Sequence, residues 1–201
     1  MRKKGLFMLA FMAVAMIASA QYSTLEIGDK APYTTYKMEN TNGKMYSFDD
    51  VKKENGTLVI FSCNTCPFVL AWENRYPKVA ELAKENKVGM ILVNSNHMKR
   101  DGDDSMEAMK KHAAEHQYKW PYVVDENSKL ANAYGAMTTP HVFLFDKNDK
   151  LVYIGAIDDN YKDASAVKDF YLKDALVSLA AGKDIAENVT RATGCSIKRM
   201  Q

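Results

Sequence analysis

A pair of cysteines directly follows a short strand pattern, and this junction limits the folds open to the chain. Residues 57–62 have the sequence TLVIFS, a β-branched and apolar run typical of a strand covered on both faces. Cys63 and Cys66 follow with two residues between them, and apolar residues then recur at helical spacing from Val69 to Ala83. The pattern predicts a strand that ends at a CxxC motif and a helix that begins near Cys66.

Strand and helix patterns alternate along the rest of the chain. Strands are predicted over 88–94, 122–124, 141–145 and 151–157, and helices over 103–116, 128–134 and 163–181. Pro77 should kink or divide the first helix because proline lacks the N–H that continues a helix. Asp103 or Asp104 is a candidate cap for the helix that follows, and Gly182 stands where the last helix should stop. Together these elements predict an α/β fold.

A turn signal lies upstream of the first buried strand. Asn42-Gly43 separates short extended pieces within residues 28–50 and predicts an N-terminal β-hairpin. No internal repeat and no linker rich in Pro, Gly or Ser interrupts the sequence, and its length suffices for one core without disulfides. We therefore expect one domain over 21–201 that closes with a C-terminal helix and a tail over 183–201.

The first twenty residues, 1–20, have the pattern of a signal peptide. Residues 2–4 are basic, 6–17 form an unbroken apolar run, and 18–20 supply the small residues of a cleavage site. The apolar run is too short to span a bilayer, which takes about 20 residues, and an uncut anchor is the alternative. We expect an exported protein, periplasmic or extracellular, that begins near Gln21 and has no stable membrane insertion after cleavage.

The charge balance gives no support for a polyanionic partner. The net charge is +2, and the first twenty residues hold three bases and no acid, which leaves 24 bases against 25 acids in the remainder. Acids and bases are interspersed, and the aromatic residues are not interleaved with bases. We therefore expect neither nucleic acid nor an acidic membrane surface as a partner.

Three cysteines, Cys63, Cys66 and Cys195, carry the most informative chemistry of the chain. An oxidising compartment favours disulfides, and an odd number of thiols leaves one unpaired. A disulfide between the two cysteines of a CxxC closes a very short loop, so it removes little chain entropy from the unfolded state and stabilises the fold only weakly. A zinc site wants four ligands, and no second CxxC or histidine pair stands at finger spacing. The sequence favours a dithiol that takes part in redox chemistry. The alternatives are a purely structural disulfide and a CxxC without a chemical function.

The order of these elements around the CxxC resembles the thioredoxin superfamily, and most closely its redoxin and peroxiredoxin-like branch. The residues that carry the likeness are Gly28-Asp29-Lys30-Ala31-Pro32, Asn42-Gly43-Lys44, Leu58-Val59-Ile60-Phe61, Cys63-Asn64-Thr65-Cys66-Pro67, Trp120-Pro121, Asp125, Tyr134-Gly135, Thr138-Thr139-Pro140 and Gly194-Cys195-Ser196-Ile197-Lys198. The resemblance implies a thioredoxin-like fold, in which helices flank a central mixed sheet.

The resemblance also implies a thiol–disulfide oxidoreductase and roles for its residues. Cys63, outside the helix and more exposed, would attack a partner disulfide, and Cys66 would resolve the mixed disulfide. Thr139 and Pro140 match the cis-proline loop, which faces the cysteines and positions the substrate backbone. The implied partners are protein or small-molecule thiols and disulfides and a redox partner dithiol, and no bound cofactor is implied.

Departures from the thioredoxin pattern leave a second function possible, that of a thiol peroxidase. Ser62 stands where thioredoxins carry Trp, and residues 58–61 contain no acid to act as a buried proton acceptor. Peroxiredoxins carry Thr-x-x-Cys-Pro, so Cys66 would be the peroxidatic cysteine, and Cys63 or Cys195 would resolve it. Such peroxidases also need that Thr, which is missing here, and a distant arginine. The candidate bases are Arg75, Arg100 and Arg191.

Copper binding is an alternative from another class of function. Thioredoxin-fold copper chaperones use two cysteines before a proline and a distant histidine, and soft thiolates suit Cu(I). His141 directly follows Pro140 and would serve with Cys63 and Cys66. Those chaperones have three residues between their cysteines, not two, which weakens this interpretation.

Two further features have an ordinary and a functional interpretation. Cys195 is a buried small residue or free thiol, unless the tail folds back and makes it a resolving or regulatory cysteine. His112 and His116 form, with Glu115, the H-x-x-E-H pattern of inverted zinc proteases. The third ligand and the large fold of such proteases are missing, so we expect no metal there.

Overall fold

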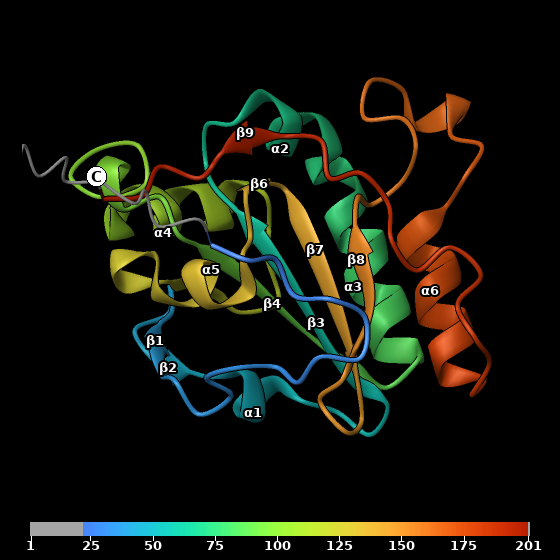
Figure 1. The fold of residues 1–201 in the computed structure, drawn as a ribbon. Helices are drawn as coiled ribbons and strands as arrows, with labels where there is room; N and C mark the ends of the chain where they lie inside the picture. Colours follow the sequence, from blue (N-terminus) through green and yellow to red (C-terminus); the bar gives the residue numbers. More distant parts are fainter. Residues whose placement is uncertain (1–21, 201) are drawn as a thin grey trace, which may run out of the picture.

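The computed structural model describes residues 22–200, and its centre is a five-stranded mixed sheet (Figure 1). The strands in spatial order are β5 (Tyr122–Val124), β4 (Val88–Asn94), β3 (Gly56–Ser62), β7 (His141–Asp146) and β8 (Leu151–Gly155). β3, β4 and β5 run parallel, whereas β7 and β8 pair antiparallel. This is the predicted α/β architecture; the predicted signal peptide lies outside the described residues.

Helices cover both faces of the sheet, because alternate residues of β3 enter two separate cores. Leu58 and Ile60 enter one core, and Val59 and Phe61 enter the other. The first core is closed by α2 (Pro67–Trp72), α3 (Tyr76–Glu85), α4 (Met106–Glu115) and α6 (Tyr171–Ala180), and the second by α1 (Phe48–Val51) and α5 (Lys129–Tyr134). Every residue of β3 is buried, as its sequence predicted.

The first predicted helix is divided, as Pro77 required. Pro77 lies in the first turn of α3, and a short 3-10 helix, η1 (Glu73–Arg75), separates α3 from α2. Proline is tolerated at that place because the first N–H groups of a helix have no intrahelical partner.

The predicted cap of the next helix was wrong. α4 begins at Met106, and Ser105 caps it by accepting a hydrogen bond from the Ala108 N–H at 3.2 Å. Asp104 is fully buried, and its carboxylate accepts hydrogen bonds elsewhere, so it is not free to cap the helix.

The helix predicted over 163–181 forms only in its second half. A 3-10 turn, η4 (Ala164–Ala166), opens the segment, and α6 begins at Tyr171. The Asp159 carboxylate accepts a hydrogen bond from the Lys168 N–H at 3.0 Å, which holds the intervening residues in a loop.

Two glycines end elements where the sequence predicted. Gly43, with φ +78°, turns the chain between β1 (Met38–Glu39) and β2 (Met45–Tyr46), which pair as the predicted N-terminal hairpin. Gly182, with φ +65°, follows the end of α6.

The C-terminal tail returns to the edge of the molecule where β3 ends. Its short strand β9 (Cys195–Ser196) pairs antiparallel with β6 (Thr138–Thr139), and Figure 1 shows it running beside β6 and α2. The tail predicted over 183–201 thus folds back and contributes a strand next to the CxxC.

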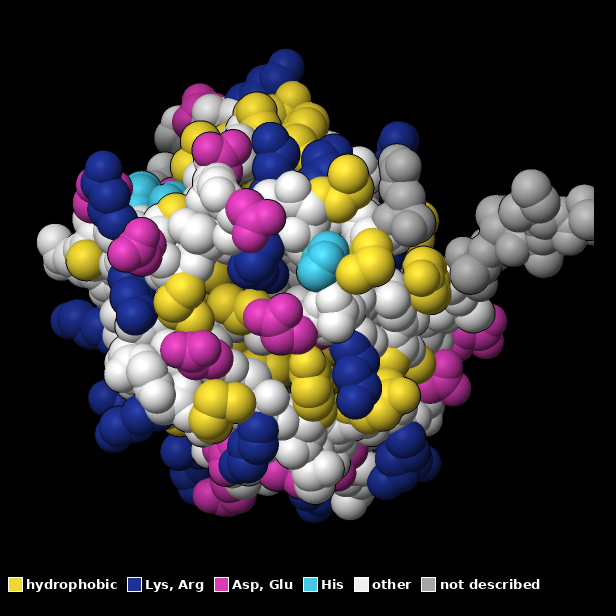
Figure 2. Space-filling view, turned by 90° about the vertical axis from the view of Figure 1, so that its left-hand side faces the viewer, with side chains coloured by type: hydrophobic (Ala, Val, Ile, Leu, Met, Phe, Trp, Pro, Cys, Tyr) yellow, Lys and Arg dark blue, Asp and Glu magenta, His cyan; other side chains and the backbone are white. Residues whose placement is uncertain are grey.

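The charged surface agrees with the interspersed pattern of the sequence. Figure 2 shows acidic and basic side chains intermixed over the face it presents, without a broad area of one sign. Across residues 22–200, no helix is both long enough and apolar enough to cross a membrane.

Candidate active site

The CxxC lies at the carboxyl end of β3, where the strand passes into α2. Cys63 directly follows the strand, and Cys66 is the N-cap residue of α2, with Pro67 as the first helical residue. A helix N-terminus presents unpaired N–H groups and a positive dipole, both of which stabilise a thiolate. The position of the motif is therefore the one predicted from the sequence.

Both thiols are buried, which corrects the prediction that Cys63 is the more exposed one. Cys63 is 2% exposed and Cys66 is 4% exposed. Thr139 covers both: its Oγ1 lies 3.3 Å from Cys63 Sγ, and its carbonyl accepts a hydrogen bond of 3.0 Å from Cys66 Sγ. Cys195 also packs against the pair. The sequence predicted that the loop with Thr139 faces the cysteines, but it left open whether the tail folds back over them.

The two thiols have opposite tendencies to ionise. The pKa of Cys66 is lowered to about 4, chiefly because the Cys63 thiol donates a hydrogen bond to it, with further hydrogen bonds from Cys195 and the Val69 backbone. The pKa of Cys63 is raised, first because its hydrogen bond to Cys66 favours the neutral thiol, and then by burial and the nearby charge of Asp104. Ionisation of the pair is therefore favoured at Cys66, and the hydrogen bond from Cys66 to the Thr139 carbonyl is made by the protonated thiol.

A buried carboxylate, Asp104, holds the loop between the cysteines. It accepts hydrogen bonds from the Asn64 backbone N–H at 2.9 Å and from the side-chain amides of Asn94 and Asn96 at 2.8 and 2.9 Å. The Tyr122 hydroxyl donates to the Asn64 side chain at 2.8 Å. The prediction missed this network; its signal was the pair of asparagines at the end of strand 88–94.

The loop that carries Thr139 and Pro140 faces the CxxC. The Thr139–Pro140 peptide bond is cis, and the residues immediately before the proline form β6. β6 pairs with the tail of the same chain, Thr138 with Ser196 and Thr139 with Cys195. The edge expected to hold a substrate backbone is thus occupied by the tail.

Cys195 reaches the active site through that pairing. Its thiol and its backbone N–H both donate hydrogen bonds to Cys66, and its own pKa is raised to about 11, first by desolvation and then by this contact. Gly194 makes the approach feasible, because a Cβ there would lie only 2.3 Å from the Thr139 carbonyl oxygen. The fold therefore gathers three free cysteines at one site.

Beyond Cys195, the tail is fixed by hydrogen bonds and by one buried side chain. The Lys198 N–H donates to the Asn96 side chain, and the Met98 N–H donates to the Lys198 carbonyl, both at 2.9 Å. Ile197 is buried in the second core. The side chain of Arg199 donates to that of Asn132 at 2.7 Å.

His141 does not join the cysteines, which corrects the proposed copper site. Its Nδ1 accepts a hydrogen bond from the Met137 N–H at 3.3 Å, and its ring packs on Phe143 with centroids 4.6 Å apart. Within residues 22–200, the His, Cys, Asp and Glu side chains that converge in a group of three or more do not include it. The residues present do not form the ligand set of that interpretation.

The arginines considered for a peroxidase have other partners. Arg75 lies 3.4 Å from the Asp158 carboxylate. Arg100 donates to the backbone carbonyls of Asp104 and Asn94 at 2.7 and 2.9 Å. Arg191 is exposed in the tail. None of the three donates a hydrogen bond to a cysteine in the part of the chain that the structure describes.

Known proteins resemble this chain in both sequence and structure. The thiol-disulfide oxidoreductase ResA of Bacillus thuringiensis subsp. konkukian is 27% identical over 131 residues, which cover 64% of this chain and 68% of ResA. An uncharacterized conserved protein from Geobacillus kaustophilus is 33% identical with a TM-score of 0.81, over 87% of this chain and 93% of its own. A hypothetical protein from Sinorhizobium meliloti 1021 is 27% identical with a TM-score of 0.80, over 89% and 97%.

A family model described as Redoxin matches residues 26–170, which include the CxxC, β3 to β8 and the cis-proline loop. At 21% identity, the thioredoxin domain of a thiol-disulfide oxidoreductase from Bacteroides vulgatus has the same fold with a TM-score of 0.57. With the strand order and the cysteine pair in place at the β3–α2 junction, the chain has a thioredoxin-like fold and belongs to the Redoxin family.

Proposed function

We propose that the protein is a thiol–disulfide oxidoreductase that works through Cys63 and Cys66. The observation that carries the proposal is the place of the two buried thiols, at the junction of β3 with the N-terminus of α2 and against Thr139. The pKa of Cys66 is lowered and that of Cys63 is raised, which favours Cys66 as the thiol that ionises first. Disulfide exchange needs a thiolate that attacks and a second thiol that resolves. The similarity to ResA, which is named a thiol-disulfide oxidoreductase, supports the same activity.

Cys66 is the attacking residue in this proposal, which reverses the order predicted from the sequence. Its thiolate bonds to one sulfur of a substrate disulfide and expels the other sulfur as a thiolate, which takes up the proton of Cys63. Cys63 then attacks Cys66 Sγ and releases the second substrate sulfur. The CxxC ends oxidised and the substrate reduced, and the reverse sequence oxidises a substrate dithiol.

The tail determines how a substrate reaches Cys66. β9 pairs with the residues that precede Pro140, and Cys195 lies against Cys66. An extended substrate that pairs with Thr138–Thr139 has to displace this segment, in the manner of strand addition to a sheet edge. Cys195 is then a second candidate to resolve the mixed disulfide, because its thiol already contacts Cys66.

We further propose that the protein is exported from the cytoplasm. The basic, apolar and small-residue regions of 1–20 support a secretory signal. An exported CxxC protein depends on a partner dithiol or disulfide for its electrons, since the mechanism above uses no bound cofactor. Its substrates are proteins or small molecules that carry thiols or disulfides.

A stopped-flow comparison of oxidants tests this function. Reduced protein is mixed once with a peptide disulfide and once with hydrogen peroxide, and the loss of thiolate is followed. We expect a fast reaction with the disulfide and a slow one with peroxide, because the described residues give Cys66 no arginine donor to polarise a peroxide. A fast, saturable reaction with peroxide alone would instead establish the peroxidase, for which the low pKa of Cys66 is the favourable observation.

A further inference from the structure

A second cluster of reactive side chains lies outside the cysteine site. Glu73 in η1, His112 in α4 and His116 at the end of α4 each place one ligand atom within 4.8 Å of the other two. Two imidazoles and one carboxylate are the protein ligands of several open zinc sites. The cluster joins η1, which follows the active-site helix, to α4.

The carboxylate of the cluster is buried and incompletely satisfied. Glu73 is 4% exposed, and its Oε1 lies 2.5 Å from His112 Nε2 and accepts a hydrogen bond from the Tyr118 hydroxyl. Its Oε2 makes no hydrogen bond to any described residue and lies 3.2 Å from His116 Nδ1. A buried carboxylate oxygen without a partner is costly, and a cation would satisfy it.

The two histidines converge because they stand four residues apart on one helix. Their ring centroids lie 4.4 Å apart, and the Tyr118 hydroxyl fixes the carboxylate between them. The acid of the sequence pattern H-x-x-E-H is Glu115, not Glu73. Glu115 is exposed, and its carboxylate lies 3.9 Å from Lys111 Nζ. The third ligand that the sequence could not supply comes from Glu73, which is distant in the chain.

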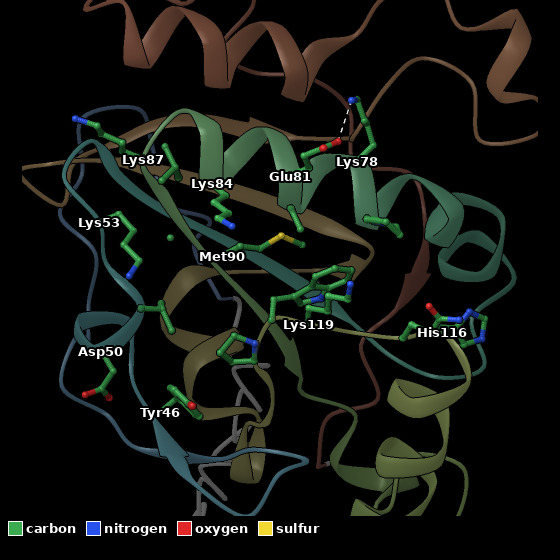
Figure 3. A pocket seen from close by; sticks show the side chains of 18 of the residues that line it. Tyr46, Asp50, Lys53, Lys78, Glu81, Lys84, Lys87, Met90, His116 and Lys119 are labelled. Carbon is green, nitrogen blue, oxygen red and sulfur yellow. Dashed lines mark hydrogen bonds and ion pairs between the residues drawn. The ribbon is translucent and has the colours of Figure 1, made fainter.

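Solvent reaches the cluster from one side. His116 has a side chain that is 39% exposed, and Figure 3 shows it at one end of a surface groove of about 1430 Å³. Three protein ligands leave a fourth tetrahedral position open to water on that side. From this geometry we propose that Glu73, His112 and His116 form a binding site for a divalent ion of the zinc class, held by two imidazole nitrogens and the carboxylate.

Equilibrium dialysis of the full chain against Zn²⁺ tests the site. The variants are His116→Ala, which removes an exposed ligand, and Glu115→Gln, which removes the neighbouring acid and is the matched control. All forms keep the three cysteines, so zinc held by thiols contributes equally. We expect the wild type and Glu115→Gln to hold one more equivalent of zinc than His116→Ala. Equal zinc contents in all three would overturn the proposal.

Two readouts identify the ligands. Co²⁺ in the wild type should give visible bands of nitrogen and oxygen coordination that His116→Ala lacks, whereas bands of thiolate coordination alone would place the ion at the cysteines and contradict the site. Tyr118→Phe should lower zinc affinity by about 10- to 100-fold, as loss of an outer hydrogen bond to a metal ligand does. Zn²⁺ should raise the Tm of the wild type by more than it raises that of His116→Ala, since any zinc held by the cysteines acts equally on both; equal shifts would contradict the proposal.

Discussion

A few hydrogen-bond donors around one sulfur decide which cysteine is charged. Cys66 accepts hydrogen bonds from Cys63, from Cys195 and from the Val69 backbone, and its pKa is lowered to about 4 from an ordinary value of 9.0. Its thiolate should therefore persist at all pH values above about 4 and be lost as the pH falls through that value. An ultraviolet titration of thiolate absorbance in the reduced protein measures this.

The titration has a built-in comparison. The pKa values of Cys63 and Cys195 are raised, so neither should ionise in the acidic range. Cys66→Ser should remove the low-pH transition, and Cys195→Ala should shift it upward because one donor is lost. A wild-type transition near the ordinary value of a thiol would contradict the assignment of the charge to Cys66.

The same asymmetry predicts which serine variant accumulates a mixed disulfide. In a Cys195→Ser background, which removes the third thiol, Cys63→Ser keeps the attacking residue and lacks the resolving one. It should trap a disulfide-containing peptide, whereas Cys66→Ser should trap at least about tenfold less. Mass spectrometry of the non-reduced proteins measures both adducts. The reverse result would restore Cys63 as the attacking thiol.

At the scale of elements, β9 and β6 form a pair that depends on a close approach at Gly194. A Cβ at this position would meet the Thr139 carbonyl oxygen at 2.3 Å, so Gly194→Ala should displace the tail from β6. Cys66 would then be uncovered, and its alkylation by iodoacetamide should accelerate at least severalfold in the reduced protein.

The control for this change lies in the same strand. Ser196 is exposed and pairs with Thr138, so Ser196→Thr keeps the pairing and should leave the alkylation rate within about twofold of the wild type. If Gly194→Ala and Ser196→Thr react at the same rate as the wild type, the tail does not limit access to Cys66.

The elements that the sequence predicted well are those with local signals. The runs TLVIFS and VGMILVN mark β3 and β4 through β-branched and apolar composition, and the strand over Tyr122–Val124 has the predicted bounds. β9 has only two residues, and nothing in its own sequence requires a strand: it exists because β6 offers an edge. The cover that β9 places over Cys66 was therefore not predictable from local patterns.

At the scale of the whole molecule, the predictions about the geometry of the candidate site were correct where a local motif carried them and incomplete where a distant contact decides the property. The CxxC and the cis-proline loop were found from motifs, whereas the lowered pKa of Cys66 depends first on Cys63 and then on Cys195, which is distant in sequence. Asp104 looked like a helix cap because the sequence places it just before a helix. In the fold it lies under the cysteine loop and binds three N–H donors. Sequence patterns alone cannot decide whether such a carboxylate caps a helix or accepts hydrogen bonds from a distant loop.

The stability of the whole domain should depend on the central strand, since β3 contributes to both cores. Leu58 is fully buried in β3, and Leu58→Ala should lower the free energy of unfolding by about 2–5 kcal/mol through lost burial and a cavity. Leu70 in α2 is 49% exposed, and Leu70→Ala should change the free energy of unfolding by no more than about 0.5 kcal/mol. Denaturant unfolding of the reduced proteins, analysed at equal m-values, compares the two. Similar losses in both variants would mean that β3 does not hold the two cores together.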